Sequence, residues 1–433
     1  MNNFYANKIA LAPMVKAGRT SLRCLSLDYG ADLVYTEEII DVKLLQSKRI
    51  VNDILNTVDY MYDEEIVLRI AKEEKPKLVL QIGTNNAENA VGVLRKLEQD
   101  IAAIDINMGC PKPFSISGGM GAFLLSKPDT VKEILTSLVA VAKIPVSCKI
   151  RVLDTSEQTR EFVKMIESTG ISAFGVHGRR RDERPTHPNR IDEIAEVVRQ
   201  ASIPVIANGH SSVIKEYSDI EAFRQETLAS SVMIGRRALS NPSIFRKEGI
   251  LSMEEDIHNF LDKACIFDEP YTQTKYVVQR ILGSQQEFDP RGRDTVAAAN
   301  VQEICKAWNK EDKFNECRDY RRRHSLKRRN SIEEENGINY ANLTFPIKRL
   351  KLKLTPKLVL NSYCDEKKLK RPIYSADKRT SDSRFEGKCE IDGKIFSSRI
   401  SQPNIKMAEQ VAALVAIIGM NIRDKLPGQW EEE

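Results

Sequence analysis

Short hydrophobic runs recur from residue 8 to about residue 240, and longer stretches with helical periodicity separate them. In residues 129–143 and 157–170, for example, apolar side chains return every three or four positions, as on one face of a helix. The runs themselves are almost continuously apolar, which indicates strands buried on both faces of a parallel sheet. They cover residues 8–14, 31–38, 77–83, 101–109, 144–152, 171–179, 203–210 and 231–238.

Eight such βα units predict an α/β fold of the (β/α)8 barrel type. A doubly wound sheet is the alternative architecture, but it normally carries a GxGxxG turn after its first strand. Here the first run ends in "LAPM", residues 11–14, so the barrel is the better prediction.

The pattern changes after the last predicted strand. Residues 246–318 show helical periodicity without a strand signal, and residues 321–337 are charged without an apolar period, as in a linker. Order returns with helices at 355–369 and 404–420 and, between them, short strands at 372–380, 384–392 and 394–401. We therefore expect a barrel domain at 1–245, a helical domain at 246–318, a charged linker at 319–344 and an α-β-β-β-α domain with a basic N-terminal extension at 345–425.

Positive charge is concentrated in the last part of the chain. The whole chain has a formal net charge of +5, with 66 Lys and Arg against 61 Asp and Glu. Residues 319–433 hold 24 and 16 of these, a net of +8, which leaves 42 and 45, a net of −3, for residues 1–318. This excess predicts a polyanionic partner, although a solvated tail would have the same composition. The run "RRRHSLKRR" (321–329) is open to interpretation as a nuclear-import signal, an RNA contact or a solvated segment.

The composition limits the cellular location and the kinds of site that we expect. The first residues lack the charged start and apolar core of a secretory leader, and the longest apolar run, 411–420, is too short to cross a bilayer. The eight cysteines are scattered, without a CxxC pair or a Cys/His cluster, so we expect neither a disulfide scaffold nor a metal site. We expect a monomer without membrane contact, located in the cytoplasm, with the nucleus as a second location.

Polar side chains stand where the predicted barrel strands end. The carboxyl ends of the strands form the face that carries the active site in such barrels. The residues there are Gln81, Asn107, Cys110, Lys149, Arg151, His177, Arg179, Asn208, Gly209, Gly235 and Arg236. Each alone has a simpler explanation, since Gln81 could cap a strand and His177 could be a core histidine. Their joint occurrence predicts a functional site, in which we assign Asn107, Arg151 and Arg179 to substrate binding.

Cys110 differs from the other cysteines because Pro111 ends its strand and a glycine-rich stretch, "GGMG" at 118–121, follows. These residues predict an exposed, mobile loop that carries the thiol.

The turns after the last two strands, 207–210 and 234–237, contain glycines that would let backbone N–H groups approach a phosphate. A phosphorylated cofactor is therefore expected. Gln81, Lys149 and His177 could bind a flat heterocycle, which favours FMN.

Seven motifs, "LAPMV", "INMGCP", "GGMGAFLL", "CKIR", "VHGRRR", "IANG" and "GRRAL", occur in this order within residues 1 to 318. Together they resemble the tRNA-dihydrouridine synthase family. With the C-terminal α-β-β-β-α segment, the chain resembles the eukaryotic branch that carries a double-stranded-RNA-binding domain and reduces the D-loop uridine called U20.

The resemblance implies that the chain reduces uridine to 5,6-dihydrouridine in tRNA, with FMN as cofactor, NADPH or NADH as reductant and Cys110 as general acid at C5 of the uracil ring. His210 is a departure, because a second glycine commonly follows "NG" in the family. The cofactor-binding residues that the resemblance implies are Pro13, Met14, Val15, Gln81, Lys149, His177, Asn208, Gly209, His210, Gly235 and Arg236.

The C-terminal segment departs from the usual duplex-RNA-binding pattern in two ways. Ile405 and a single Lys406 stand where a lysine pair is usual, and the loop at 375–384 lacks the usual Gly-Pro-x-His element. We therefore expect the preceding basic extension to make much of the RNA contact. The RNA-binding residues predicted in this part are Lys348, Arg349, Lys351, Lys353 and Lys406, and in the helical domain Lys275, Arg280 and Arg291.

Two other functions fit part of these observations. A flavoprotein of the dihydroorotate dehydrogenase type would share the barrel and the flavin, but it would not need a basic RNA-binding tail. A duplex-RNA-binding regulator with an inactive barrel would need the tail, but it would not need Cys110, Lys149 and His177 together.

Overall fold

A computed structural model describes residues 3–63, 65–184, 186–330, 332–343, 355–379 and 384–422. The chain divides into a first compact unit, Met1–Arg318, and a second, Asp319–Glu433. The predicted RNA-binding residues Lys348, Arg349, Lys351 and Lys353 lie outside the described residues.

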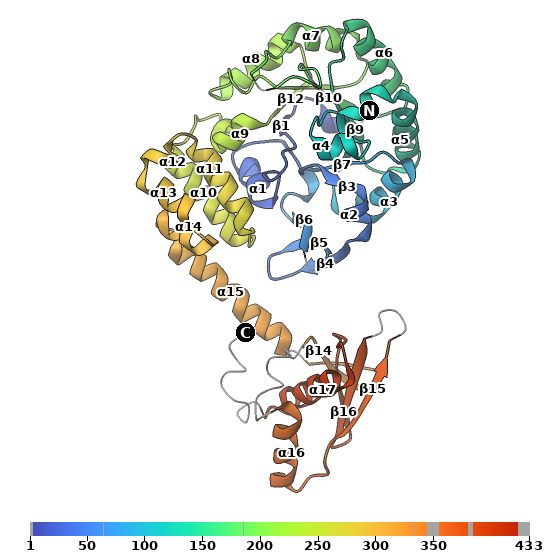
Figure 1. The fold of residues 1–433 in the computed structure, drawn as a ribbon, viewed down its shortest axis with the longest axis vertical. Helices are drawn as coiled ribbons and strands as arrows, with labels where there is room; N and C mark the ends of the chain where they lie inside the picture. Colours follow the sequence, from blue (N-terminus) through green and yellow to red (C-terminus); the bar gives the residue numbers. More distant parts are fainter. Residues whose placement is uncertain are drawn as a thin grey trace. The chain divides into compact units, whose positions relative to one another are not determined.

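A closed ring of eight parallel strands forms the centre of the first unit (Figure 1). The ring closes because β2 pairs with both β1 and β7. The strands are β1 (Ile9–Leu11), β2 (Leu33–Tyr35), β7 (Leu78–Gly83), β8 (Ala103–Asn107), β9 (Val146–Arg151), β10 (Ala173–His177), β11 (Val205–Asn208) and β12 (Ser231–Ile234). Each lies inside one of the eight predicted runs, which confirms the (β/α)8 barrel.

Helices surround the ring (Figure 1). One helix follows each barrel strand along the chain, either directly or after an intervening segment. They are α1 (Thr20–Asp28), α2 (Asp41–Gln46), α3 (Ala87–Leu97), α5 (Pro128–Val141), α6 (Ser156–Glu167), α7 (Ile191–Gln200), α8 (Tyr217–Thr227) and α9 (Arg236–Ser240). A short helix, α4 (Pro113–Ser117), and the 3-10 helix η4 (Gly121–Ser126) lie between β8 and α5.

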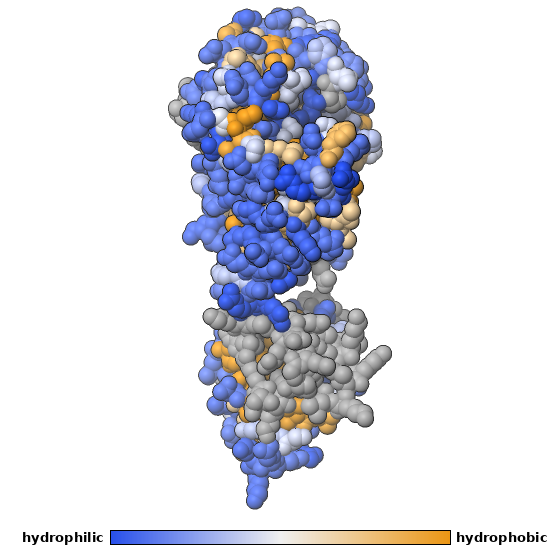
Figure 2. Space-filling view, turned by 90° about the vertical axis from the view of Figure 1, so that its left-hand side faces the viewer, coloured by the Kyte–Doolittle hydropathy of each residue, from blue (hydrophilic) through white to orange (hydrophobic). Residues whose placement is uncertain are grey.

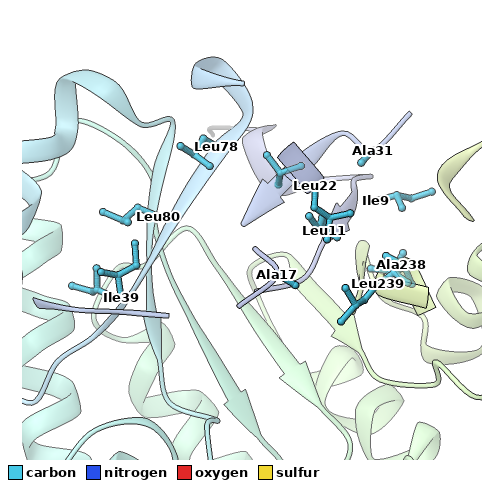
Figure 3. Packing of buried hydrophobic residues seen from close by; sticks show 14 of the residues in the cluster. Ile9, Leu11, Ala17, Leu22, Ala31, Ile39, Leu78, Leu80, Ala238 and Leu239 are labelled. Carbon is cyan, nitrogen blue, oxygen red and sulfur yellow. The ribbon is translucent and has the colours of Figure 1, made fainter. Parts of the chain in front are cut away.

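Alternate residues of the barrel strands belong to two hydrophobic clusters. Leu78 and Leu80 of β7 and Ile9 and Leu11 of β1 belong to the cluster between the strands and the helices, several of whose side chains are drawn in Figure 3. Residues of opposite parity belong to a smaller cluster, which includes Val79, Ala103, Ala173, Ile206 and Met233. Because successive side chains of a strand point to opposite faces, the smaller cluster marks the interior of the ring.

An antiparallel sheet, inserted in the chain between the second and third βα repeats of the barrel, was not predicted. It consists of β4 (Lys48–Asn52), β5 (Thr57–Tyr62) and β6 (Glu65–Ala71), and it follows α2. Most of β4 is exposed, so its sequence lacks the apolar run by which the barrel strands are recognised. A further short strand, β3 (Ile39–Ile40), pairs with the end of β7.

Helices complete the first unit, in agreement with the helical periodicity of residues 246–318. They are α10 (Met253–Ile266), α11 (Tyr271–Leu282), α12 (Gln285–Phe288), α13 (Pro290–Ala297) and α14 (Val301–Ala307). Ser252 caps α10 through a capping box with Glu255, and buried Trp308 donates a hydrogen bond from Nε1 to Thr295 Oγ1 at 2.9 Å. The helices belong to the same unit as the barrel, and a domain boundary at residue 245 stays a prediction.

The second unit contains the predicted α-β-β-β-α order. Helices α16 (Pro356–Lys367) and α17 (Ile405–Gly419) flank β15 (Ile373–Lys378), β16 (Phe385–Ile391) and β17 (Lys394–Ser398) in the chain. Its core joins Leu360 of α16 and Phe396 of β17 to the apolar face of α17, where Val411, Val415 and Ala416 are fully buried.

Most of the segment expected to be a charged linker, 319–344, has regular structure instead, within its described residues 319–330 and 332–343. Helix α15 runs from Glu311 to Asn330, and the strands β13 (Glu333–Glu335) and β14 (Ile338–Ala341) follow. β14 pairs in parallel with β17, which extends the sheet of the second unit to the order β13-β14-β17-β16-β15. Lys, Arg and Glu are good helix formers without an apolar stripe, which is why the hydrophobic pattern missed α15.

The visible surface of the first unit is mainly hydrophilic. On the face that Figure 2 shows, hydrophobic side chains form small, separate patches. Among the described residues, no helix is both long and apolar enough to cross a membrane. Within the same residues, no group of three His, Cys, Asp or Glu side chains could hold a metal ion.

Candidate active site

Polar side chains replace the apolar ones on the interior face of the ring as the strands approach their carboxyl ends. On β8, Ala103 is followed at the same parity by Asp105 and Asn107, and on β7 Val79 is followed by Gln81. The strand register places Asn107 opposite Lys149, and His177 opposite both Arg151 and Asn208. The structure therefore brings together six predicted site residues on this face, namely Gln81, Asn107, Lys149, Arg151, His177 and Asn208.

A chain of hydrogen bonds crosses this interior and ends at the cysteine loop. Tyr5 Oη and Ser147 Oγ are 2.9 Å apart, and Ser147 Oγ donates to Asp105 Oδ1 at 2.7 Å. Gln81 Nε2 donates to Asp105 Oδ2 at 2.7 Å, and Gln81 Oε1 accepts from Asn107 Nδ2 at 2.8 Å. Gln81, expected to bind the flavin, is thus buried and uses its amide to orient Asn107.

Asp105 is the member of this chain that sequence reasoning missed. It is 1 % exposed, and burial raises its pKa to about 6, against the opposing effect of Gln81, Ser147 and Lys149. A carboxylate inside an apolar strand is costly unless it is hydrogen-bonded. The sequence did contain a signal for it, because Asp105 is a carboxylate in the apolar run 101–109, at a position whose side chain points into the ring.

The cysteine loop is held from both sides. Asn107 Oδ1 accepts hydrogen bonds from the backbone N–H groups of Gly109, at 3.0 Å, and Cys110, at 2.9 Å. Arg151 Nε donates to the carbonyl of Gly109 at 2.6 Å. Asn107 and Arg151, assigned to substrate binding, therefore also position the thiol.

Gly121 shows what the glycines of this loop do. Its φ is +58°, and a Cβ atom there would lie 2.3 Å from Ser115 Oγ and 2.7 Å from the Cys110 carbonyl oxygen. Only glycine permits this close approach. The sequence predicted that the glycines give mobility, whereas in the structure Gly121 allows the loop to fold tightly around Cys110.

The Cys110 thiol is partly buried and favours its protonated form. Burial and the neighbouring Glu38 carboxylate raise its pKa to about 11. At neutral pH such a thiol keeps its proton and can donate it to a basic carbon, as a general acid must.

Cations gather around a neutral imidazole at the same end of the barrel. Burial and the neighbouring Arg151 lower the pKa of Lys149 to about 8, and burial lowers that of Arg151 to about 10. Burial and the surrounding cations hold the pKa of His177 well below its ordinary value. Burial also lowers the pKa values of Arg179 and Arg236. Positive charge crowded in this way is relieved by an anionic ligand.

The two glycines predicted to bind a phosphate lie in the turns that follow β11 and β12. Gly209 has a φ of +121°, and a Cβ atom there would lie 2.5 Å from the Asn189 side chain. Asn208 Nδ2 donates to the Met233 carbonyl at 3.0 Å, which ties the turn to β12. Gly235 precedes α9, and a Cβ atom there would lie 3.8 Å from Met14 Sδ, so the predicted phosphate turn and flavin-lining loop are neighbours.

The remaining predicted cofactor residues lie around these turns. Pro13 and Met14 are partly buried and Val15 is exposed in the loop after β1. His210 adopts the left-handed φ of +60° that favours glycine, and its ring stacks on Phe223 with centroids 5.1 Å apart. The departure from glycine is therefore accommodated without loss of the turn. The cations and the neutral imidazole form a set that suits an anionic cofactor with a flat ring, such as FMN.

Two basic residues of the helical region differ from expectation. Lys275 Nζ donates to the carbonyls of Val296 and Ala298, at 2.7 and 2.9 Å. Arg291 pairs with Glu254 and Asp289 and lies over the ring of Trp308. These side chains support the helices, so they are not free to bind phosphates in this structure. Arg280 lies over the Tyr276 ring, and Lys406 is exposed at the start of α17.

The chain matches two protein families and is similar to several known proteins. The family Dihydrouridine synthase (Dus) matches residues 10–335, and the family Double-stranded RNA binding motif matches residues 356–419. A tRNA-dihydrouridine(20) synthase [NAD(P)+] of Schizosaccharomyces pombe is 36% identical over 314 residues, which are 70% of this chain and 64% of that protein. The protein of the same name from Saccharomyces cerevisiae is 36% identical over 304 residues, 66% of this chain and 79% of that protein.

A solved double-stranded-RNA-binding domain is also similar to part of this chain. A crystal structure of a tRNA-dihydrouridine(20) synthase double-stranded-RNA-binding domain is 26% identical. It covers 20% of this chain and 90% of that chain, with a TM-score of 0.19.

Proposed function

The chain belongs to the dihydrouridine synthase family, and we propose that it reduces uridine to 5,6-dihydrouridine at position 20 of the tRNA D-loop. In this proposal FMN is the cofactor and NADPH or NADH the reductant. The observation that carries it is the position of Cys110, in a loop whose backbone Asn107 and Arg151 hold at the end of the barrel where Lys149 and His177 face the interior. Its raised pKa keeps the thiol protonated near neutral pH. The names of the two yeast relatives, tRNA-dihydrouridine(20) synthase [NAD(P)+], support the substrate and the reductant.

FMN, when bound and reduced, supplies the hydride that the C5=C6 double bond of uracil requires. The chain would hold it with the turns at Asn208–His210 and Gly235–Arg236, whose backbone N–H groups and cations suit its phosphate. The ring would lie against Pro13, Met14 and Val15. Lys149 and His177 would contact it from β9 and β10, and Gln81 would reach it from β7.

Cys110 donates the proton in this proposal. The electron pair that develops at C5 of the uracil ring takes the proton from Sγ, and the sulfur keeps the electrons of the S–H bond as a thiolate. Asn107 fixes the backbone of Cys110, so the thiol is in position before the substrate arrives. Arg151 and Arg179 supply positive charge for the substrate.

RNA binding falls mainly to the second unit in this proposal. Its net charge of +8 contrasts with −3 in the first unit, and release of counterions from phosphates dominates the affinity for nucleic acid. The extension that contains Lys348, Arg349, Lys351 and Lys353, with Lys406 on α17, would bind the phosphates. A uridine in folded tRNA must then leave its stack to reach the interior of the barrel.

The test uses the full chain, FMN, NADPH and tRNA from cells that lack this protein. We expect FMN to bind without a covalent bond and dihydrouridine to form at position 20, mapped by mass spectrometry of tRNA fragments. Free uridine and orotate serve as competing substrates in parallel reactions. Failure to modify tRNA, or reduction of orotate in its place, would overturn the proposal.

A further inference from the structure

Glu38, between β2 and β3, lies beside the thiol of the cysteine loop. It is 8 % exposed, and its Oε1 atom accepts a hydrogen bond from Ser115 Oγ at 3.0 Å. Ser115 lies on α4 and is fully buried. A buried carboxyl group next to the reacting thiol has no structural need in a barrel, because an apolar side chain would fill the same space at lower cost.

Two glycines leave the room that this arrangement needs. A Cβ atom on Gly83, at the end of β7, would lie 2.8 Å from Glu38 Oε1. A Cβ atom on Gly121 would lie 2.3 Å from Ser115 Oγ and 3.1 Å from Cys110 Cβ. The Glu38, Ser115 and Cys110 side chains, which we call the thiol–carboxyl cluster, therefore require glycine at both positions.

The second oxygen of Glu38 is unusual. Oε2 is buried and has no hydrogen-bond partner among the described residues. The adjacent Glu37, by contrast, pairs with Arg19 at 3.1 Å and accepts the N–H of Lys16 at 2.9 Å. Burial raises the pKa of Glu38, against the opposing effect of hydrogen bonds with Cys110 and Ser115.

We propose that Glu38 is a positioning residue of the reaction, which keeps the proton on Cys110 before the uracil ring is protonated and returns a proton to the sulfur afterwards. The inference rests on the proposed function for the origin of the thiolate. When Cys110 has lost its proton to C5, two anionic groups would stand side by side, and such a pair cannot both stay ionised. Glu38 then takes a proton from a hydronium ion of the solvent, which becomes water, and passes it to Sγ. In this transfer the carboxyl O–H bond breaks, the S–H bond forms and the carboxylate is restored.

The charges that face Cys110 set the direction of the effect. Glu38 disfavours the thiolate, whereas Lys149 and Arg151 favour it. Ser115 can hydrogen-bond to either group, and it holds Oε1 in the present arrangement. Removal of the Glu38 charge leaves the two cations unopposed, so the thiolate must form at lower pH.

The first test measures the reactivity of the thiol in the full chain, without tRNA or reductant. Iodoacetamide modifies the thiolate, and the Cys110 peptide is followed by mass spectrometry from about pH 6 to about pH 10. In Glu38→Gln we expect the alkylation profile to move to lower pH, with the rate at about pH 8 rising about tenfold for each pH unit of the shift. Glu38→Asp, which keeps the charge but withdraws it from the sulfur, should fall between Glu38→Gln and the wild type.

Glu37→Gln is the matched control, because it makes the same change at the adjacent residue, whose carboxylate binds Arg19. Its alkylation profile should coincide with that of the wild type. An unchanged profile in both Glu38 variants, or an equal shift in Glu37→Gln, overturns the proposal. A wild type that alkylates as expected but makes no dihydrouridine would refute the proposed function alone.

The second test compares the first turnover with later ones. The comparison is made at about pH 6, well below the ordinary thiol pKa of roughly 8.5, so that Glu38→Gln still starts with a protonated thiol. Its first dihydrouridine should form at a rate within about threefold of the wild type, and later turnovers should slow about tenfold or more. Equal slowing of the first and later turnovers would show that Glu38 does not return the proton.

Discussion

Replacement of Asp105 by asparagine tests the hydrogen-bond chain inside the barrel through its effect on stability. Asp105 is buried with a pKa of about 6, above the ordinary value of 3.8, and accepts hydrogen bonds from Gln81 and Ser147. Because the folded-state pKa is raised, the folded protein holds this proton more tightly than the unfolded chain. Its contribution to stability is complete below the unfolded pKa and is lost as the pH rises through the folded pKa.

The magnitude follows from the shift of the pKa. The difference between 3.8 and about 6 corresponds to roughly 3 kcal/mol of unfolding free energy, lost between about pH 4 and about pH 6. Asparagine cannot ionise, so Asp105→Asn should lack this part of the pH dependence. Its amide can still accept from Gln81, while Ser147 can turn to accept from the new NH2 group.

Urea unfolding at several pH values, monitored by tryptophan fluorescence, measures the free energies of unfolding of the variant and the wild type. The free energy of unfolding of Asp105→Asn relative to the wild type should increase by roughly 3 kcal/mol between about pH 4 and about pH 7. In Ser147→Ala, which removes one donor to Asp105, the loss of stability should extend to higher pH. A constant difference between Asp105→Asn and the wild type across this range would refute the reasoning.

Three further predictions address the loop and the RNA-binding part. Gly121→Ala should destabilise the first unit by about 1–3 kcal/mol and lower the activity, because φ is +58° and the new methyl group would meet Ser115; a thermal melt with unchanged midpoint would contradict this. A chain of residues 1–330 should keep its flavin and its NADPH oxidation but lose most of its affinity for tRNA, because it lacks the segment 356–419 that matches the double-stranded RNA binding motif; tight tRNA binding by this chain would contradict the assignment of RNA binding to that segment. Simultaneous neutralisation of Lys348, Arg349, Lys351 and Lys353 should weaken tRNA binding more than Lys406→Ala does. It should also reduce the slope of log affinity against log salt concentration by about 0.9 for each phosphate that the variant no longer neutralises. If Lys406→Ala has the larger effect in a salt series, α17 makes the main RNA contact instead.

The sequence was most informative where burial is uniform. The barrel strands, such as Leu78–Gly83, are buried along their whole length and therefore stand out as apolar runs. β4 is mostly exposed, and α15 is mainly charged and polar, so neither produces a hydrophobic period. β14 adds to its sheet by backbone pairing with β17, which leaves little trace in the side chains.

The residues of the candidate site also divide into those that the sequence could place and those that it could not. Residues at the ends of predicted strands, such as Asn107 and His177, could be placed together because the barrel determines where strand ends meet. Glu38 could not, because its proximity to the thiol depends on how the segment after β2 and helix α4 fold against each other. Its neighbour Glu37 has the same side chain and binds Arg19 instead, so only the structure distinguishes the two.

The most direct test of the account is the oxidation of the reduced, FMN-loaded protein by tRNA in a single turnover, with wild type and Cys110→Ala compared side by side. The thiol acts only when the uracil ring is protonated, so Cys110→Ala should bind FMN and accept electrons from NADPH as the wild type does. Its single-turnover rate with tRNA should fall about 10²–10⁴-fold, the usual loss for a positioned general acid. A rate near that of the wild type would contradict the assignment of Cys110 as the acid.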